Sequence, residues 1–273
     1  MSTQPGGDWR PLSQWRLAVH DLMDGLRAHR VWMMLASMDI RQRYRRSVIG
    51  PFWITITMVI WILAIGPLYS HLLGIGANEF IPYVAIGIIT WGLISGLLLD
   101  GANAFVSADN LVRSVKLPYT VHILRVLQRN LIIFVHNLLA FVPFMLWLGI
   151  WPQWRWLAAI PGVALILMAA MPAAFLLGTL SARFRDLQQI IASIVQLAFF
   201  MTPIFWKAEL LRERSWFAEY NPFQVMLELV RRPIVEGIPD WATYGKMLLL
   251  IVVLYLWAAP FFATYRRRLA FWV

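Results

Sequence analysis

The sequence is organised around residues 39–53, which read Asp39-Ile-Arg-Gln-Arg-Tyr-Arg-Arg-Ser-Val-Ile-Gly-Pro-Phe-Trp53. A cluster of arginines runs here directly into a long apolar segment. On a helix, Met33, Ala36, Ile40 and Tyr44 share one face, and Arg41 and Arg43 flank it. The opposite face carries Asp39, Gln42, Arg45 and Arg46. This layout is typical of a helix that lies flat at a lipid headgroup boundary. We therefore expect an amphipathic interface helix over 30–50.

The composition is that of an integral membrane protein. Of the 273 residues, 60% are hydrophobic and 14% are charged, whereas a soluble domain has about 25% charged residues. Gly50 permits a sharp turn, and Pro51 suits the first position of a helix. A span needs about 20 mostly apolar residues. We expect an all-α membrane protein with six transmembrane helices, at 52–73, 81–99, 130–150, 157–181, 189–206 and 247–265.

The basic residues predict the orientation of these spans. Arginines and lysines are frequent before the first span, around 113–129, after the fourth span and at 266–268, but are absent from 74–80. This is the positive-inside pattern with both termini in the cytoplasm. The first thirty residues lack the apolar core of a secretory signal, so no cleavable leader is expected. The predicted organisation is a cytoplasmic segment over 1–29, the interface helix, and a transmembrane domain over 51–273.

The segment 207–240 falls on the outer side in this arrangement, although it carries basic residues. It carries acidic residues as well, and it is too short to span twice. Asn221 followed by Pro222 is a good N-cap and first-turn pair. Pro233 is expected to end that helix. We interpret 207–240 as a periplasmic re-entrant helical hairpin.

Two cytoplasmic connections are candidates for contact with another protein. Residues 105–118 predict a short helix that is capped at Ser107 or Asp109 and stops before Pro118. Exposing its branched apolar side chains to water without a partner is unfavourable, so a docking helix is favoured over a solvated loop. Residues 182–189 are a shorter version of the same pattern, for which membrane anchoring by arginines is an equal alternative.

The residues that are missing narrow the possible functions. There is no cysteine, and Gly245-Lys246 lacks the glycines of a phosphate-binding loop, so the chain has no P-loop for ATP. The spans contain almost no carboxylates, which argues against an ion-coupled transporter. The five histidines show no metal spacing, so neither a metal site nor a catalytic site is expected. Arginines beside apolar spans indicate anionic lipid rather than nucleic acid.

Aromatic residues are abundant, with 15 Trp, 16 Phe and 8 Tyr. Many of the tryptophans fall where interface belts belong. Aromatic faces stack on sugar C–H faces without one fixed hydrogen-bond geometry, so they could line a path for a glycan. Packing and lipid anchoring remain the alternative. The candidate lining residues are Trp53, Trp61, Tyr69, Trp91, Phe199 and Phe200.

Several segments resemble the membrane subunits of type-2 ABC polysaccharide exporters, the Wzm-type permeases that move O-antigen, capsule and teichoic acid. They are 39–53, 123–134, 182–206 and 221–231, which occur in the same order. The resemblance implies a homodimer with a continuous channel and two separate nucleotide-binding subunits, which would use ATP and Mg²⁺. It also implies that the N-terminal amphipathic helix and the connection 105–118 contact those subunits, and that the hairpin 207–240 forms a periplasmic gate. The residues expected at the ATPase contact are Asn110, Leu111, Arg113, Lys116, Arg185 and Asp186, and those expected at the gate are Asn221, Pro222, Phe223, Glu228 and Arg231.

Together these observations predict the permease subunit of an ATP-driven exporter in the bacterial inner membrane, with no enzymatic activity of its own. Its cargo would be a lipid-linked polysaccharide that moves from the cytoplasm to the periplasm. The pyrophosphate of the lipid carrier is expected at the basic rim formed by Arg41, Arg43, Tyr44, Arg45 and Arg46. The alternative is an integral-membrane glycosyl- or acyltransferase acting on a lipid-linked saccharide. A transferase would need an acidic pair or a well-placed histidine on a membrane-facing loop.

Overall fold

The computed structural model describes residues 11–43, 45, 47–208 and 216–272, and all regular structure in these ranges is helical. The α-helices are α1 (Pro11–Arg27), α2 (His29–Arg43), α3 (Phe52–Leu73), α4 (Ala77–Ala102), α5 (Asp109–Ser114), α6 (Tyr119–Leu139), α7 (Val142–Leu148), α8 (Ala159–Arg183), α9 (Leu187–Met201), α10 (Trp216–Glu219), α11 (Pro222–Val235) and α12 (Trp241–Trp272). Two 3₁₀ turns, η1 (Val106–Ala108) and η2 (Trp154–Ala158), complete the described elements.

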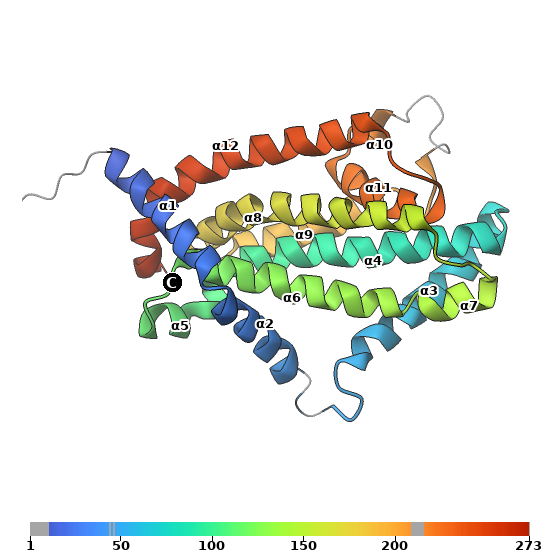
Figure 1. Cartoon of the computed structure of the whole chain (residues 1–273), viewed down its shortest axis with the longest axis horizontal. Coiled ribbons are helices and arrows are strands. Elements are labelled where there is room, and N and C mark those ends of the chain that lie inside the picture. The colour runs from blue at the N-terminus through green and yellow to red at the C-terminus, as the bar shows by residue number, and fades with distance from the viewer. Residues whose placement is uncertain (1–10, 44, 46, 209–215, 273) are drawn as a thin grey trace, which may run out of the picture.

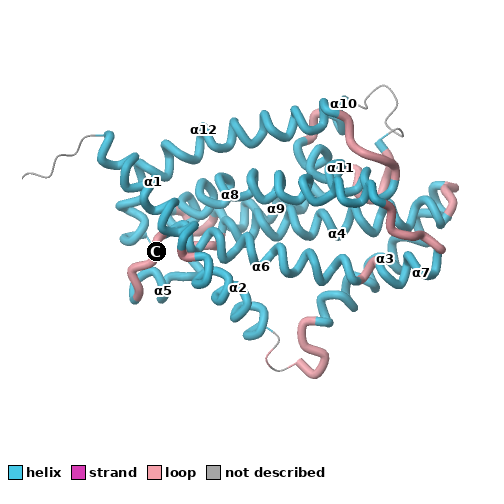
Figure 2. The backbone as a smooth tube through the Cα atoms, in the orientation of Figure 1, coloured by secondary structure: helices cyan, strands magenta, loops and turns pink. Residues whose placement is uncertain are grey.

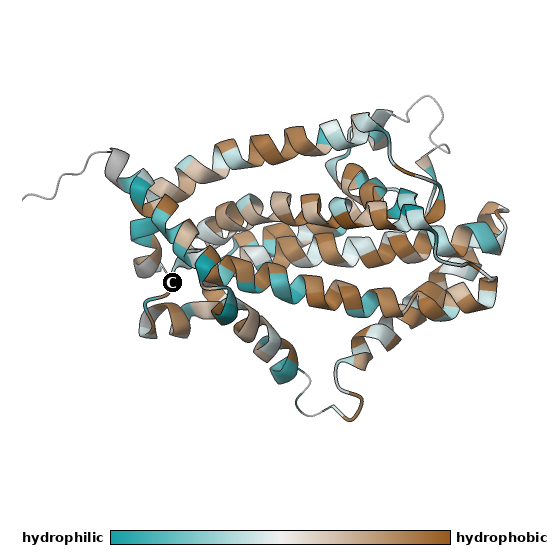
Figure 3. Cartoon of the chain, in the orientation of Figure 1, coloured by the Kyte–Doolittle hydropathy of each residue, from teal (hydrophilic) through white to brown (hydrophobic). Residues whose placement is uncertain are grey.

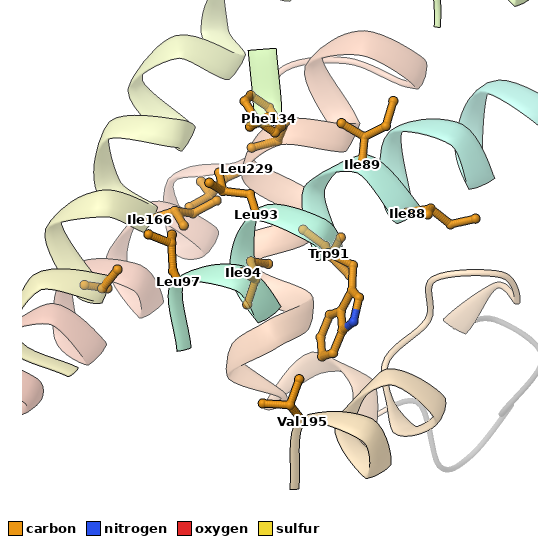
Figure 4. Close-up of a cluster of buried hydrophobic side chains, with 14 of the residues drawn as sticks. Ile88, Ile89, Trp91, Leu93, Ile94, Leu97, Phe134, Ile166, Val195 and Leu229 are labelled. Atoms are coloured by element: carbon orange, nitrogen blue, oxygen red, sulfur yellow. The ribbon is translucent and has the colours of Figure 1, made fainter. Parts of the chain in front are cut away.

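Helix α4 is the centre of the bundle and packs against α3, α6, α8, α9 and α11 (Figure 1). Its apolar window is 78% buried, whereas that of α3 is only 11% buried. The core around α4 contains Trp91, Leu93 and Leu97, with Ile166 from α8 and Leu229 from α11 beside them (Figure 4). This packing holds the short helix α11 against the long helices. Most of α3 is left for lipid or another chain.

The long apolar helices agree with most of the predicted spans. Five are long and apolar enough to cross a membrane within the described ranges: α3, α4, Tyr119–Leu148, Trp154–Arg183 and Trp241–Leu269. Hydrophobic stretches occupy the middle of α8 and α12, and hydrophilic residues concentrate toward the two ends of the bundle (Figure 3). The third span begins at Tyr119 rather than 130, because Pro118 ends the preceding connection and α6 starts directly after it.

The predicted span 189–206 differs from the structure. Helix α9 has 15 residues and ends at Met201, which is about 22 Å of helix against roughly 30 Å of hydrocarbon. The backbone leaves the helix at Thr202, whose ψ of 136° is extended, because the residue before a proline avoids the helical region. A full-length helix over 189–206 is therefore wrong, although α9 packs against α4 and α8 (Figure 2).

The N-terminal region also differs from its prediction. Residues 11–27, within the predicted N-terminal segment 1–29, form the helix α1, which packs on α6 and α12. The helix that corresponds to the predicted interface helix, α2, spans His29–Arg43 and not all of 30–50. Gly50 has a φ of 62°, the left-handed conformation that glycine adopts without steric cost, so the predicted turn is present. The chain reverses here between α2 and α3 (Figure 1).

Two details of the other connections were predicted incorrectly. Helix α5 begins at Asp109, but its N-cap is Ala108 and no side chain caps it, so the expected cap at Ser107 or Asp109 is wrong. Helix α11 continues to Val235, two residues beyond Pro233. A proline removes its own N–H and crowds the preceding turn, so a helix can run briefly past it before it ends.

Candidate functional site

A buried arginine lies at the end of the bundle that is opposite the termini. Arg231, on α11, is 1% exposed. Its guanidinium donates to the carbonyl oxygen of Pro203 at 2.6 Å and to Glu228 Oε1, and its Cζ lies 3.9 Å from the centre of the Tyr83 ring. Burial disfavours the charged form, but Tyr83 and Glu228 offset this and raise the pKa of Arg231, which stays cationic.

Further hydrogen bonds join the same three segments. The Tyr83 hydroxyl donates to the carbonyl oxygens of Pro203 and Trp206, at 3.3 and 3.0 Å. Asn221 caps α11 by accepting from the Phe223 N–H at 2.9 Å, as predicted, and its amide donates to Thr202 Oγ1 at 3.1 Å. We call the contacts of Tyr83, residues 202–206 and Arg231 the outer latch. The latch fixes the turn after α9 between α4 and α11.

The helix backbones at the outer latch approach closely. A Cβ on Gly162 of α8 would lie 2.4 Å from the Leu229 carbonyl oxygen of α11. A Cβ on Gly87 of α4 would lie 3.1 Å from the Ile204 carbonyl oxygen. Glycine at these positions lets α11 and the 202–206 turn pack directly on the long helices. Helix α11 and the 202–206 turn are therefore held by backbone contact as well as by charge.

A second polar network lies at the opposite end of the bundle. Asp39 of α2 accepts from Arg125 Nε at 2.8 Å and from Arg129 Nη1 at 3.0 Å, and both arginines lie on α6. Arg129 Nη2 also lies 2.9 Å from Asp100 Oδ2 of α4, to which Asn130 donates at 2.9 Å. We call this set the inner network. It fixes α2 to α6 and α4.

The inner network corrects one expectation about the interface helix. Asp39 was expected on the face opposite the apolar stripe, but its side chain is only 11% exposed and points to α6. Ala36 and Ile40 are buried as expected, whereas Met33 is 40% exposed. A charged residue can lie on the packed face when arginines on the neighbouring helix compensate it.

A polar cavity of about 370 Å³ adjoins the inner network. Its wall includes Asp39, Arg43, Asp100, Asn103 and Arg129. The Gln188 amide at the start of α9 donates to Asn103 at 3.1 Å, so α9 begins beside this cavity. The walls carry both signs of charge, and the inner network already neutralises most of them.

The candidate lining aromatics divide into two groups. Tyr69 contacts Phe205 at 5.2 Å between ring centres, Phe205 contacts Phe199 at 5.5 Å, and Phe199 contacts Trp91 at 5.8 Å. Phe200 packs on Phe199 at 5.3 Å. These rings connect α3, α4 and α9 in one cluster next to the outer latch.

The other two aromatics lie apart from that cluster. Trp53 and Trp61 of α3 are 51% and 53% exposed, whereas Trp91 is 7% exposed. Trp91 points into the core in Figure 4 and also contacts Phe223 of α11, with 5.5 Å between ring centres. Trp91 is therefore a packing residue in this chain, and Trp53 and Trp61 are open to contact from outside it.

A sequence profile described as "ABC-2 type transporter" matches residues 30–234. The chain belongs to the ABC-2 type transporter family.

Proteins similar to this ABC-2 transporter carry a more specific name. An O-antigen export system permease protein RfbA from Myxococcus xanthus is 28% identical over 243 residues, which cover 86% of this chain and 91% of that protein. A protein of the same name from Klebsiella pneumoniae is 20% identical over 211 residues, covering 77% and 82%. The family and the five long apolar helices identify this ABC-2 transporter as a multi-pass membrane protein.

The residues expected to contact an ATPase subunit lie at the same end of this ABC-2 transporter as the inner network. Leu111 of α5 is half-buried, and Lys116, Arg185 and Asp186 are exposed. The side chains of Asn110 and Arg113 lie outside the described part of the structure. Leu111 and Lys116 lie in the connection that ends where α6 begins.

The expected pyrophosphate rim is exposed where it is described. Arg41, Arg43 and Arg45 are all exposed to solvent. Tyr44 and Arg46 lie outside the described residues. Arg43 also borders the polar cavity beside the inner network. The rim and the cavity therefore form one continuous polar region on this ABC-2 transporter.

Sequence reasoning missed several partners in these networks. On the sequence pattern alone, Asp39 falls on the polar face of a helix, and Arg125 and Arg129 count only among the basic residues around 113–129 that indicate topology. Their spacing of four residues on one helix face was the available signal. The sequence carries no signal for the role of Tyr83, because a single tyrosine in an apolar span of an ABC-2 transporter looks like any other packing residue. Among the described residues, no group of three or more His, Asp or Glu side chains gathers as a metal site requires.

Proposed function

We propose that this chain is the channel-forming membrane subunit of an ABC exporter that moves a lipid-linked, O-antigen-like polysaccharide from the cytoplasm to the periplasm across the inner membrane. The observation that carries the proposal is the match to the ABC-2 family over residues 30–234, together with relatives named O-antigen export permeases. The chain spans 91% and 82% of the length of the two relatives described. The similarity therefore extends over most of each relative rather than over a fragment of it.

The proposed topology has six passes with both termini in the cytoplasm. The loop between α3 and α4 has no basic residue. The connection 103–118 and the C-terminal end of α12 both carry basic residues, which marks them as cytoplasmic. Helix α9 is the short pass, which residues 202–206 and the outer latch complete on the periplasmic side. Non-helical backbone within the membrane is tolerated only where the protein buries it or where it lines a water-filled cavity. The hydrogen bonds to the carbonyl oxygens of Pro203 and Trp206 support this arrangement.

We place the energy source on a separate chain. The sequence has no P-loop, so ATP and Mg²⁺ would be bound by two copies of a nucleotide-binding subunit. Those subunits would press on α5 and on the α8–α9 turn near Asp186. Both lie at the end of the bundle that holds the interface helix (Figure 1). A push there would reach α6 through the start of that helix and α2 through the inner network.

The exposed helices suggest how two copies would enclose a path. The apolar window of α3 is 11% buried, and Ile190, Ile194, Leu197 and Phe200 on α9 are all more than half exposed. In a homodimer these faces could meet lipid, the second copy or the cargo. Trp53, Trp61 and Phe200 are the aromatics available to line a path. Their flat faces would let a glycan slide.

The rim arginines and the outer latch lie at opposite ends of the bundle, and we assign each a role in transport. The exposed arginines of the rim would attract the lipid pyrophosphate at the cytoplasmic surface. At the other end, the outer latch would hold α11 as a gate, with Glu228 and Arg231 in its closed contacts. Opening would require the 202–206 turn to leave Arg231. The alternative transferase is less well supported, since Asp39 and Asp100 are both engaged by arginines.

Copurification and ATPase measurements test this function. The chain is expressed with and without its candidate ATPase, purified, and reconstituted in vesicles with a fluorescent lipid-linked polysaccharide. We expect no ATP hydrolysis by the chain alone, and hydrolysis with cargo translocation by the complex. A variant of the ATPase that cannot hydrolyse ATP is the control. Substantial ATPase activity or export by the isolated chain would contradict the proposal.

A further inference from the structure

We infer that Asp21 is a positioning residue that joins the start of α6 to the C-terminal part of α12 through α1. The inference rests on the proposed function, because the segment it would position is the predicted ATPase-contacting connection 105–118. Asp21 and its partner Arg266 both lie outside the residues matched by the family profile, 30–234. The contact therefore joins two residues outside the matched range to Tyr119 and Thr120 within it.

Asp21 supplies a helix cap from a distant part of the chain. Its Oδ1 accepts from the Thr120 N–H at 3.0 Å and from Thr120 Oγ1 at 2.8 Å, and its Oδ2 accepts from the Tyr119 N–H at 3.1 Å. The N-cap residue of α6, Pro118, makes no side-chain cap bond. The first N–H groups of a helix lack partners within the helix and attract a negative charge. Here α1 provides that charge.

The same carboxylate binds the C-terminal region. Arg266 of α12 donates to Asp21 Oδ2 from Nε at 3.2 Å and from Nη2 at 2.9 Å. The Asp21 side chain is 0% exposed and that of Arg266 is 24% exposed. The Arg266 guanidinium also lies 5.5 Å from the centre of the Tyr119 ring. One carboxylate therefore contacts two helices that are far apart in the sequence.

Gly25 is a second, independent indication that α1 packs specifically against the start of α6. It lies one turn after Asp21, and a Cβ at this position would be 2.4 Å from Thr120 Cβ and 2.6 Å from Thr120 Cγ2. Only glycine lets the α1 backbone approach Thr120 so closely without displacing it. The polar contact and the steric contact both fall on the same residue of α6.

The position of this contact indicates its role. The connection 105–118 ends immediately before Tyr119, so the segment that would receive the push of the ATPase leads straight into the capped residues. With the Asp21 contacts in place, α6, α1 and α12 move together when that segment moves. Without these contacts, α6 loses its cap. A movement of the connection 105–118 then unwinds the first turn of α6 instead of moving the whole helix. Asp21 is thus expected to matter for coupling more than for assembly.

Hydrogen–deuterium exchange of the purified chain tests the geometry without any transport assay. In Asp21→Ala, the amides of Tyr119 and Thr120 should exchange on the order of tenfold faster, which corresponds to the loss of a typical cap. Asp21→Asn keeps an acceptor oxygen and should give a smaller increase. Asp24→Asn is the matched control, because Asp24 lies on the same helix, is 37% exposed and pairs with His20. Unchanged exchange in Asp21→Ala would overturn the inference.

A reconstituted complex with the ATPase tests the role in coupling. At equal membrane abundance, Asp21→Ala and Arg266→Gln should retain ATP hydrolysis but lower polysaccharide exported per ATP several-fold, while Asp24→Asn behaves as wild type. The swap of Asp21→Arg with Arg266→Asp should not restore coupling, since arginine has no acceptor for the α6 amides. If the swapped variant regained coupling, an ion pair between α1 and α12 would be sufficient without the cap on α6. That result would overturn the positioning role.

The two proposals fail in different ways. If the wild-type complex exports no polysaccharide, the proposed function is wrong, and the exchange measurement still decides whether Asp21 caps α6. If the wild type exports and Asp21→Ala exports equally well per ATP, the function stands and the positioning role is wrong. Arg266→Gln covers the case in which Asp21→Ala does not fold, because it leaves the cap in place.

Discussion

The Arg231 guanidinium lies over the Tyr83 ring, with its Cζ 3.9 Å from the ring centre, and it joins α11 to α4 at a point where both are buried. The charge is compensated by Glu228 on the same helix and by the Pro203 carbonyl oxygen. A cation over an aromatic face gains most when water is excluded. This pair therefore acts as the centre of the outer latch.

Replacing Arg231 by methionine should destabilise the protein strongly. The substitution leaves the Glu228 carboxylate and the Pro203 carbonyl oxygen without their donor, and breaking a buried pair in this way costs about 3–5 kcal/mol. The matched control is Arg232→Met, since Arg232 is 33% exposed and its ion pairs are 3.6 and 3.7 Å long. Thermal unfolding in detergent should show a large loss for the first variant and a change of about 1 kcal/mol or less for the second. Equal losses would show that the latch is not centred on Arg231.

Gly96 should not tolerate alanine. A Cβ there would lie 2.2 Å from Asn130 Oδ1, so Asn130 would have to leave Asp100 and weaken the inner network. Gly92, one turn earlier on α4, is the control, because a Cβ there would meet its nearest atoms at 3.9 Å. Gly96→Ala is expected to lower the melting temperature by several degrees and Gly92→Ala to leave it nearly unchanged.

A second substitution tests the cause of the Gly96 effect. If the clash is with Asn130, Asn130→Ala should relieve part of it, so that the double variant loses less than the sum of the two single losses. Strictly additive losses would refute the proposed clash. The measurement is the same thermal unfolding series on all three variants.

Replacing Asp39 by asparagine should release the interface helix. Arg125 and Arg129 would face each other across the site without the shared carboxylate, which leaves a partly buried positive charge uncompensated. We expect faster proteolysis within 29–43 and a loss of about 2 kcal/mol or more. Asp186→Asn, at an exposed position, should change neither stability nor cleavage. Unchanged cleavage in Asp39→Asn would show that apolar packing alone holds α2.

Replacing Trp91 should lower stability, whereas replacing Trp61 should affect transport without lowering stability. Trp91→Ala removes a buried side chain and should cost about 3–5 kcal/mol. Trp61→Ala removes a half-exposed side chain and should leave the melting temperature within about two degrees. If Trp61 lines the glycan path, surface polysaccharide should nevertheless fall in cells that carry Trp61→Ala. Undiminished polysaccharide at normal protein abundance would remove Trp61 from the path.

Local chemistry in the sequence was enough to predict several features. Apolar length predicted the long helices, since a run of about 20 apolar residues can cross the hydrocarbon core as a helix whose backbone hydrogen bonds are all internal. Gly50 predicted a turn that has a positive φ, and Asn221 with Pro222 predicted a helix start that Asn221 caps. These features depend on a few adjacent residues, so the sequence determines them directly.

The burial of the aromatics could not be predicted in the same way. Trp61 and Trp91 both lie in long apolar runs, yet one is 53% exposed and the other 7%. Lipid is as apolar as the protein core, so hydrophobic periodicity cannot distinguish a face that meets lipid from one that meets another helix. Only the packing of α4 at the centre of the bundle decided which tryptophan is buried.

The sequence by itself determined that this chain is a helical membrane protein of the ABC-2 type without a P-loop, because composition, length and local motifs are properties of neighbouring residues. The tertiary structure alone decided the charge pairs and the length of α9. Asp39 and Arg125 are separated by 86 positions, and Asp21 and Arg266 by 245. Nothing in either local sequence specifies its partner, because a carboxylate takes the cation that the folded helices bring within reach.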